Sequence, residues 1–167
     1  MKVKKIYLDM DGVLSDFEGK FSEIFGESPH GIRERKDFTD HWPTFVEQKQ
    51  FENLNWFPGG EELVKFVRSI PNVEIEILSS SGGMRFQDEV KEQKKNWLKK
   101  NGLAFKAHVV PGRKKKAEYA TPETILIDDT EDVIVQFNQA GGIGILHRNV
   151  GETVDKIKLL LDSNINI

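Results

Sequence analysis

Two pairs of acidic residues follow apolar runs, and each pair offers carboxylates for chemistry. Asp9 and Asp11 end the first run, and Asp128 and Asp129 end a later one. Carboxylates that gather in one place repel one another unless a divalent cation lies among them. Magnesium prefers such hard oxygen ligands and keeps positions open for water and a phosphate oxygen. The four carboxylates therefore predict a magnesium site.

A hydroxyl and a cluster of lysines follow two further apolar runs. Ser79 supplies a hydroxyl group, and the run at residues 114–116 supplies at least one ammonium group. One of these lysines is expected to reach the site. Spacing from the end of the preceding apolar run favours Lys114 for this place, whereas spacing from Ala120 favours Lys115 or Lys116. We prefer Lys114. Four carboxylates, a hydroxyl and at least one ammonium group are thus expected around one magnesium site.

Alternating strands and helices are expected to position these side chains. Five apolar runs predict strands at residues 3–8, 73–78, 105–110, 125–127 and 143–146. Helical spacing of apolar residues predicts helices at 61–69, 85–101, 115–120, 131–140 and 153–162. Such alternation predicts an α/β fold, Rossmann-like, with a parallel five-stranded sheet and helices on both faces. The carboxyl ends of parallel strands meet at one edge, where ligands bind.

Residues 17–58 break this alternation and predict a small helical cap inserted into the core of residues 1–16 and 59–167. The insertion holds nine of the sixteen aromatic residues, and its periodicity predicts one helix at 17–25 and a second at 45–51. Phe17, Trp42 and Trp56 are candidates for stacking on a substrate base. The alternative is that these rings form the small core of the cap, and they could equally support a homodimer interface.

The motifs resemble those of the haloacid dehalogenase superfamily, in the right order along the whole chain. The run DMDGVLSDF at residues 9–17 is similar to the first motif, Ser79-Ser80 to the second, the lysines at 114–116 to the third, and IDD at 127–129 to the fourth. Within the superfamily, the chain most resembles the 5′(3′)-deoxyribonucleotidases and their phage and bacterial relatives. The resemblance lies in the first motif, in residues 51–60 and in the sequence IDD at residues 127–129.

The resemblance implies a role for each motif residue. Asp9 is the implied nucleophile and Asp11 the implied general acid and base. Ser79 and Lys114 complete the implied catalytic set, and Ser80 and Gly12 bind phosphate. Magnesium is implied as cofactor, held by the Asp9 side chain, the Asp11 main-chain oxygen and Asp129, with Asp128 as a ligand through water or as a support behind the direct ligands. The implied substrate is a small phosphorylated metabolite, with a nucleoside monophosphate as the best single candidate.

Two departures from the nucleotidase pattern bear on the substrate. Those enzymes follow the second motif with a Ser-Pro-like turn and the fourth with Arg, whereas here Ser80 precedes Ser81-Gly82 and Asp129 precedes Thr130. The alternatives are a nucleic-acid 3′-phosphatase on the same fold and a receiver-like domain that is phosphorylated on Asp without turnover. The aromatic insertion favours the enzyme, because receiver domains are shorter and have no cap.

Composition excludes several other classes of function. The chain has 167 residues and no cysteine, which excludes thiol catalysis and cysteine-ligated metal sites. The net charge of −3 argues against a general nucleic-acid binder, although residues 85–116 hold eleven Lys or Arg against three Asp or Glu. No apolar run approaches the ~18 residues of a membrane span or the core of a signal peptide. We therefore expect a cytoplasmic enzyme with no membrane partner.

Overall fold

A five-stranded parallel sheet forms the centre of the molecule. The computed structural model describes residues 2–29 and 36–165. The strand order is β3-β2-β1-β4-β5, and every neighbouring pair is parallel. The strands are β1 (Lys5–Leu8), β2 (Glu74–Ser80), β3 (Lys106–Val110), β4 (Thr124–Asp128) and β5 (Ile143–Leu146). The predicted α/β fold with a parallel five-stranded sheet is confirmed.

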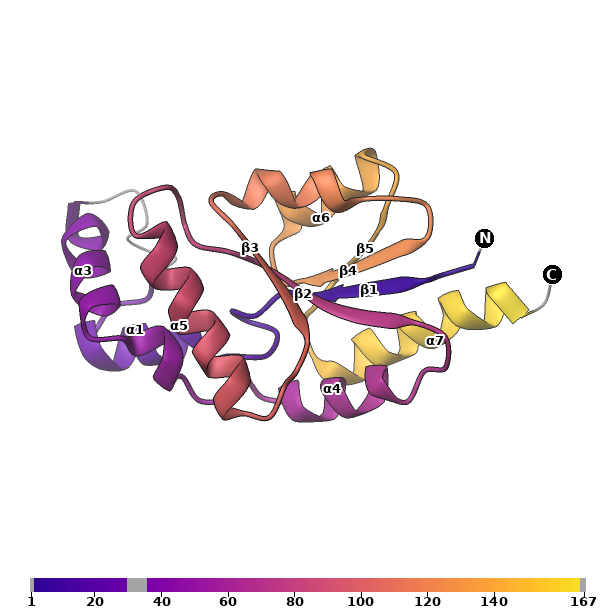
Figure 1. Ribbon diagram of the computed structural model, residues 1–167, viewed down its shortest axis with the longest axis horizontal. Coiled ribbons are helices and arrows are strands. Elements are labelled where there is room, and N and C mark those ends of the chain that lie inside the picture. Colours follow the sequence, from indigo (N-terminus) through magenta and orange to yellow (C-terminus); the bar gives the residue numbers. More distant parts are fainter. Residues whose placement is uncertain (1, 30–35, 166–167) are drawn as a thin grey trace.

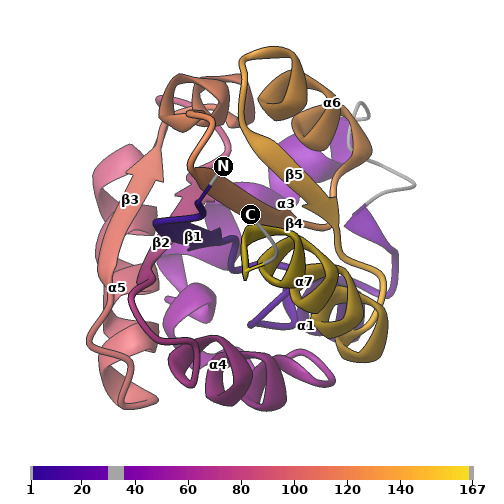
Figure 2. The same ribbon diagram turned by 90° about the vertical axis from the view of Figure 1, so that its right-hand side faces the viewer.

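Helices cover both faces of the sheet (Figures 1 and 2). Side chains alternate between the faces along each strand, so Ile6 and Leu8 pack into one core cluster and Tyr7 into the other. The first cluster lies under α4 (Gly60–Arg68), α5 (Gln87–Lys100) and α7 (Val150–Ile165). The second lies under α6 (Glu131–Gln139) and the 3₁₀ helix η2 (Arg113–Tyr119).

The predicted insertion lies beyond the carboxyl ends of the strands (Figure 1). It contains α1 (Phe17–Phe25), α3 (Lys36–Glu47) and the short 3₁₀ helix η1 (Gln50–Asn53). Its rings pack on one another, with Phe17 contacting Phe45 and Phe51 at centroid distances of 5.2 and 5.5 Å. This segment therefore has an aromatic core of its own, placed over the edge of the sheet where ligands bind in such folds.

The helix predicted at 115–120 is the 3₁₀ helix η2, and two helices differ from their predicted limits by three residues or more. The last helix begins at Val150 rather than 153, because the Asn149 side chain accepts a hydrogen bond of 2.9 Å from the Glu152 amide and caps the first turn. In the insertion, the helix predicted at 45–51 is the end of α3 followed by η1. α3 begins at Lys36 rather than 45 and contains Pro43.

In the described part of the chain, residues 2–29 and 36–165, no helix combines the length and the apolar character that crossing a membrane requires.

Candidate active site

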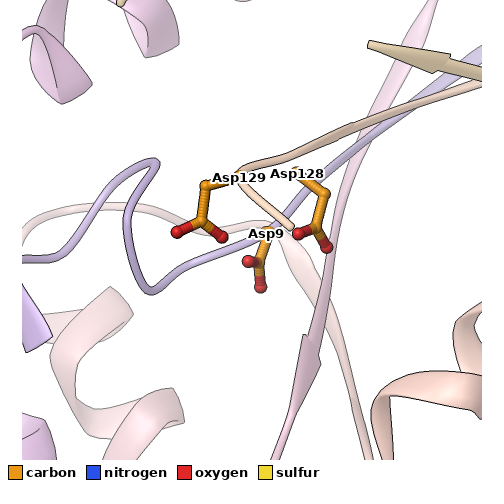
Figure 3. A group of neighbouring side chains, drawn as sticks. All are labelled: Asp9, Asp128 and Asp129. Atoms are coloured by element: carbon orange, nitrogen blue, oxygen red, sulfur yellow. The ribbon is translucent and has the colours of Figure 1, made fainter. Parts of the chain in front are cut away.

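Three carboxylates meet where β1 and β4 end. Asp9 follows β1 and donates its backbone N–H to the carbonyl of Ile127 at 3.0 Å, which ties the two strand ends together. Asp128 is the last residue of β4, and Asp129 follows it. Each of the three residues has a carboxylate oxygen within 4.8 Å of the others (Figure 3). The acidic pairs, 119 residues apart in the sequence, are thus brought together as parallel pairing requires.

Gly12 allows the turn after β1 to pass close to this cluster. Its φ of 80° lies in the left-handed region, and a Cβ at this position would collide with the Asp129 carboxylate. The turn is closed by the Gly12 amide, which donates to the Ser15 carbonyl at 2.9 Å. A residue without a side chain is therefore required here for Asp129 to take its position.

Lys116 is the lysine that enters the site, and the preference for Lys114 is corrected. The Lys116 Nζ lies 3.0 Å from Asp9 Oδ1 and 2.7 Å from Asp128 Oδ2, and its side chain is buried. Lys114 and Lys115 are exposed on the outer side of η2. The three adjacent lysines point in different directions around the 3₁₀ helix, and only the last faces the ends of the strands.

The electrostatics of the cluster reflect crowded negative charge. Burial, and then the charge of Asp128, raise the pKa of Asp9 well above its usual value. Burial and the same neighbour raise the pKa of Asp129 to about 6. Burial alone would lower the pKa of Lys116, but Asp9 and Asp128 raise it, so this ammonium group stays charged. One cation therefore compensates only part of the charge of three carboxylates.

This donor set fits magnesium. The cluster offers hard carboxylate oxygens within 4.8 Å of one another, and burial and then mutual repulsion raise the pKa values of Asp9 and Asp129. Asp128 is already occupied at both oxygens, because Lys116 donates to Oδ2 and the Thr130 amide donates to Oδ1 at 2.9 Å. Each of the three carboxylates offers an oxygen within 4.8 Å of the others, and Asp128 is the one held by these two hydrogen bonds.

A cavity of about 800 Å³ opens over the carboxylate cluster and beneath the insertion. Most of the residues proposed from the sequence line it: Asp9, Asp11, Gly12, Phe17, Trp42, Ser79, Ser80 and Asp129. Phe57 lines it as well. The cavity therefore places phosphate-binding groups and aromatic rings around one space.

Trp56 lies elsewhere, which corrects its expected place in the substrate pocket. It does not line this cavity. Its ring packs edge to face against Trp97 of α5, with centroids 4.9 Å apart, and its backbone bridges to Ser15. His41 is also outside the cavity and stacks on Phe25 at 4.1 Å. The Trp56 ring thus packs the insertion against the core, and the His41 ring packs within the insertion.

Lys94 is a site residue that the sequence analysis did not identify. Its Nζ donates to Asp11 Oδ2 at 2.9 Å and to Ser79 Oγ at 2.7 Å, and the residue is 2% exposed. A signal was present in the sequence, because Lys94 falls on the apolar face of α5, between Val90 and Trp97. A lysine on the buried face of an amphipathic helix is rarely accommodated without an acidic partner.

Comparisons with known proteins bear on the family and the fold of the chain. The family model described as "5′ nucleotidase, deoxy (Pyrimidine), cytosolic type C protein" matches residues 2–153. The fold is similar to a hydrolase from Streptococcus pneumoniae TIGR4, with a TM-score of 0.57 and 17% identity over 95% of this chain and 100% of that chain. A haloacid dehalogenase superfamily hydrolase from Ehrlichia chaffeensis gives a TM-score of 0.57 and 16% identity over 96% and 99% of the two chains. The comparison with curated proteins gives no match.

Proposed function

The chain belongs to the deoxy (pyrimidine), cytosolic type C 5′-nucleotidase family, and on this premise we propose that it is a magnesium-dependent nucleotidase. It releases phosphate from nucleoside monophosphates through an aspartyl-phosphate intermediate. Family membership and the shared fold confirm the resemblance to the haloacid dehalogenase superfamily, and the chain is a hydrolase of that type. The observation that carries the proposal is the contact of the Lys116 ammonium with both Asp9 and Asp128.

In this mechanism Asp9 is the nucleophile. A carboxylate oxygen of Asp9 attacks phosphorus, a new P–O bond forms, and the bond from phosphorus to the nucleoside oxygen breaks. Asp11 gives its proton to the departing oxygen, which leaves as the nucleoside hydroxyl. Water then attacks phosphorus while Asp11 takes up a proton, and the P–O bond to Asp9 breaks. Inorganic phosphate leaves and both carboxyl groups return to their starting states.

Lys116 and Ser79 bind the phosphoryl group in this proposal. An ammonium group has three donors, and Lys116 directs two of them to Asp9 and Asp128. The third remains for a phosphoryl oxygen, where positive charge stabilises the transition state. Ser79 accepts a hydrogen bond from Lys94, so its own hydroxyl proton can be donated to the phosphoryl group. Ser80 and the turn at Gly12 border the same space.

Magnesium would be held by the Asp9 and Asp129 side chains and the main-chain oxygen of Asp11, with Asp128 acting through Lys116 and Thr130. When bound, it supplies positive charge to the phosphoryl oxygens and relieves repulsion among the carboxylates. The closeness of the three carboxylates, each with an oxygen within 4.8 Å of the others, supports this assignment. The chain's own residues carry out every proton transfer described above.

The insertion supplies the nucleoside pocket. We assign residues 17–58 as a cap domain over a core of residues 1–16 and 59–167. The rings of Phe17, Trp42 and Phe57 border the cavity and offer apolar faces to a base. The cytosolic class of the family supports a cytoplasmic enzyme that acts on free nucleotides.

The test is phosphate release from a panel of deoxynucleoside and nucleoside monophosphates, 5′ and 3′, beside sugar phosphates. Each compound is assayed with magnesium and with a chelator. We expect magnesium-dependent release that Asp9→Asn abolishes and that Asp88→Asn, an exposed change on α5, leaves intact. The preferred compound identifies what the cavity recognises.

A protein that binds magnesium but releases phosphate from none of these compounds would contradict the proposal. DNA and RNA carrying 3′-phosphate ends would then be assayed, because the basic residues of 85–116 would suit such a substrate. Labelling of Asp9 by a small phosphodonor without turnover would instead indicate a receiver-like role.

A further inference from the structure

Lys94 occupies a buried position that the mechanism above does not explain. It lies on α5, 83 residues from Asp11 in the sequence, and is 2% exposed. Burying an ammonium group has a large desolvation cost unless acceptors surround it. Its Nζ has three: Asp11 Oδ2 at 2.9 Å, Ser79 Oγ at 2.7 Å and the Ser80 carbonyl at 2.8 Å.

These three contacts use every proton that the ammonium group can donate. Lys94 differs in this respect from Lys116, which has two such contacts. A lysine with no remaining donor is not arranged to bind a phosphoryl oxygen. It is arranged to hold its acceptors in fixed relative positions.

Asp11 is held from both sides. Lys94 donates to its Oδ2, and the Ser15 hydroxyl donates to its Oδ1 at 3.2 Å. Among the residues that the structure describes, Asp11 is not part of the carboxylate cluster of Asp9, Asp128 and Asp129. The side chain of Asp11 is therefore kept apart from the cation site and available to the leaving group.

The position of Lys94 is itself fixed by packing against the insertion. On the same helix, the side chain of Gln93 donates to the Val46 carbonyl at 2.8 Å, and Trp97 Nε1 donates to the Leu54 carbonyl at 2.8 Å. The Lys94 ammonium also lies 5.3 Å from the centroid of the Phe51 ring. The hydrogen bonds of Gln93 and Trp97 therefore attach α5 to the insertion on both sides of Lys94.

From this geometry we propose that Lys94 is a positioning residue that orients the carboxyl group of Asp11 toward the leaving oxygen. This inference rests on the proposed phosphatase function. It extends that function by assigning the general acid a structural support supplied from α5 rather than from the motif that contains it.

The test compares substrates that differ in their need for a general acid. A nucleoside or glycerol phosphate must have its departing oxygen protonated, whereas p-nitrophenolate leaves from p-nitrophenyl phosphate without a proton. The measured quantity is kcat/KM, because it reports the steps up to phosphoryl transfer and excludes hydrolysis of the intermediate. The reference variant is Asp11→Asn, and the matched control is Lys95→Met, the exposed neighbour on α5.

We expect Lys94→Met to lower kcat/KM for the alkyl phosphates by about 100-fold and for p-nitrophenyl phosphate by less than about tenfold. Asp11→Asn likewise lowers kcat/KM more for the alkyl phosphates than for p-nitrophenyl phosphate. The double variant has a kcat/KM only a little below that of either single variant. Lys95→Met is unchanged. Ser15→Ala, which removes the second contact to Asp11 and leaves α5 untouched, gives a smaller split of the same sign. If Lys94→Met does not fold, Ser15→Ala tests the inference in its place.

Equal losses for both kinds of substrate, or additive losses in the double variant, would overturn the inference, as would a higher KM with unchanged kcat. Failure of the nucleotidase proposal is distinguishable. In that case the unaltered enzyme hydrolyses glycerol phosphate and p-nitrophenyl phosphate but no nucleotide, and the comparison of Lys94 variants proceeds with those two compounds.

Discussion

The ammonium group of Lys116 lies 3.0 Å from the carboxylate of Asp9, although 107 residues separate the two in the sequence. Both side chains are buried, and the same ammonium contacts Asp128 at 2.7 Å. The contact crosses the sheet edge from η2 to the end of β1. It fixes which of three adjacent lysines belongs to the site.

Replacement of Lys116 is expected to lower activity, whereas replacement of the nearby Lys114 is not. We expect Lys116→Met to lower kcat/KM by about 100-fold or more, since it removes a buried cation from a site whose transition state is stabilised by charge. Lys114→Met, at an exposed position on the same 3₁₀ helix, leaves kcat/KM within about twofold. Steady-state kinetics of the two variants, with folding followed by circular dichroism, make the comparison. Equal activity of both variants would contradict the assignment.

Stability without metal is expected to fall as pH rises. The pKa of Asp129 is raised to about 6, above its usual 3.8, by burial and by the charge of Asp128. The folded protein therefore holds this proton more tightly than the unfolded chain does, so the contribution to stability is complete below about pH 4 and is lost as pH rises through 6. The loss amounts to about 2–3 kcal/mol.

Thermal unfolding of the chelator-treated protein between pH 4.5 and 7.5 measures this effect, a shift in unfolding temperature on the order of 5–10 °C. Added magnesium raises the unfolding temperature most at the higher pH, because it binds the ionised carboxylates. Asp129→Asn flattens both the pH dependence and the response to magnesium. A metal-free protein that becomes more stable from pH 5 to pH 7 would disprove the assigned direction.

A methyl group at Gly12 is expected to disturb the cation site itself. Gly12→Ala places a Cβ against the Asp129 carboxylate and strains a residue with φ of 80°. Gly26→Ala is the matched control, because its φ is 73° but no atom lies within 4 Å of the added Cβ. Both variants lose about 1–2 kcal/mol from the backbone.

Calorimetric titration with magnesium distinguishes the two glycine variants. Gly12→Ala weakens magnesium binding at least about tenfold, whereas Gly26→Ala binds as the unaltered protein does. Equal affinities for the two variants would mean that the closeness of Gly12 to Asp129 has no bearing on the metal.

Of the two tryptophans in the insertion, Trp42 is expected to affect substrate binding and Trp56 to affect stability. Trp42 borders the cavity, so Trp42→Leu raises KM for a nucleotide by about tenfold, as loss of one stacking contact would. Trp56 packs against Trp97 outside the cavity, so Trp56→Leu lowers the unfolding temperature with little change in KM. KM values and melting curves for both variants provide the check. The prediction fails if Trp56→Leu has the larger effect on KM.

Much of the fold follows from local sequence patterns. Apolar runs that end in Asp or Ser predicted the strands and the edge at which their carboxyl ends gather, because strand periodicity and parallel order are short-range and topological rules. The acidic pairs and Ser79 were found in this way. The first residue of α7 was not, since the cap at Asn149 acts within a single turn that periodicity averages over.

By itself the sequence determined the order of the elements and the kinds of side chain at the strand ends. Only the tertiary structure decided that Lys116 rather than Lys114 contacts Asp9, that Trp56 faces Trp97 rather than the cavity, and that Lys94 reaches Asp11 from α5. The physical reason is that each depends on the rotation of one helix or loop against distant elements. That rotation is set by the packing of buried side chains from several elements at once, which no local pattern records.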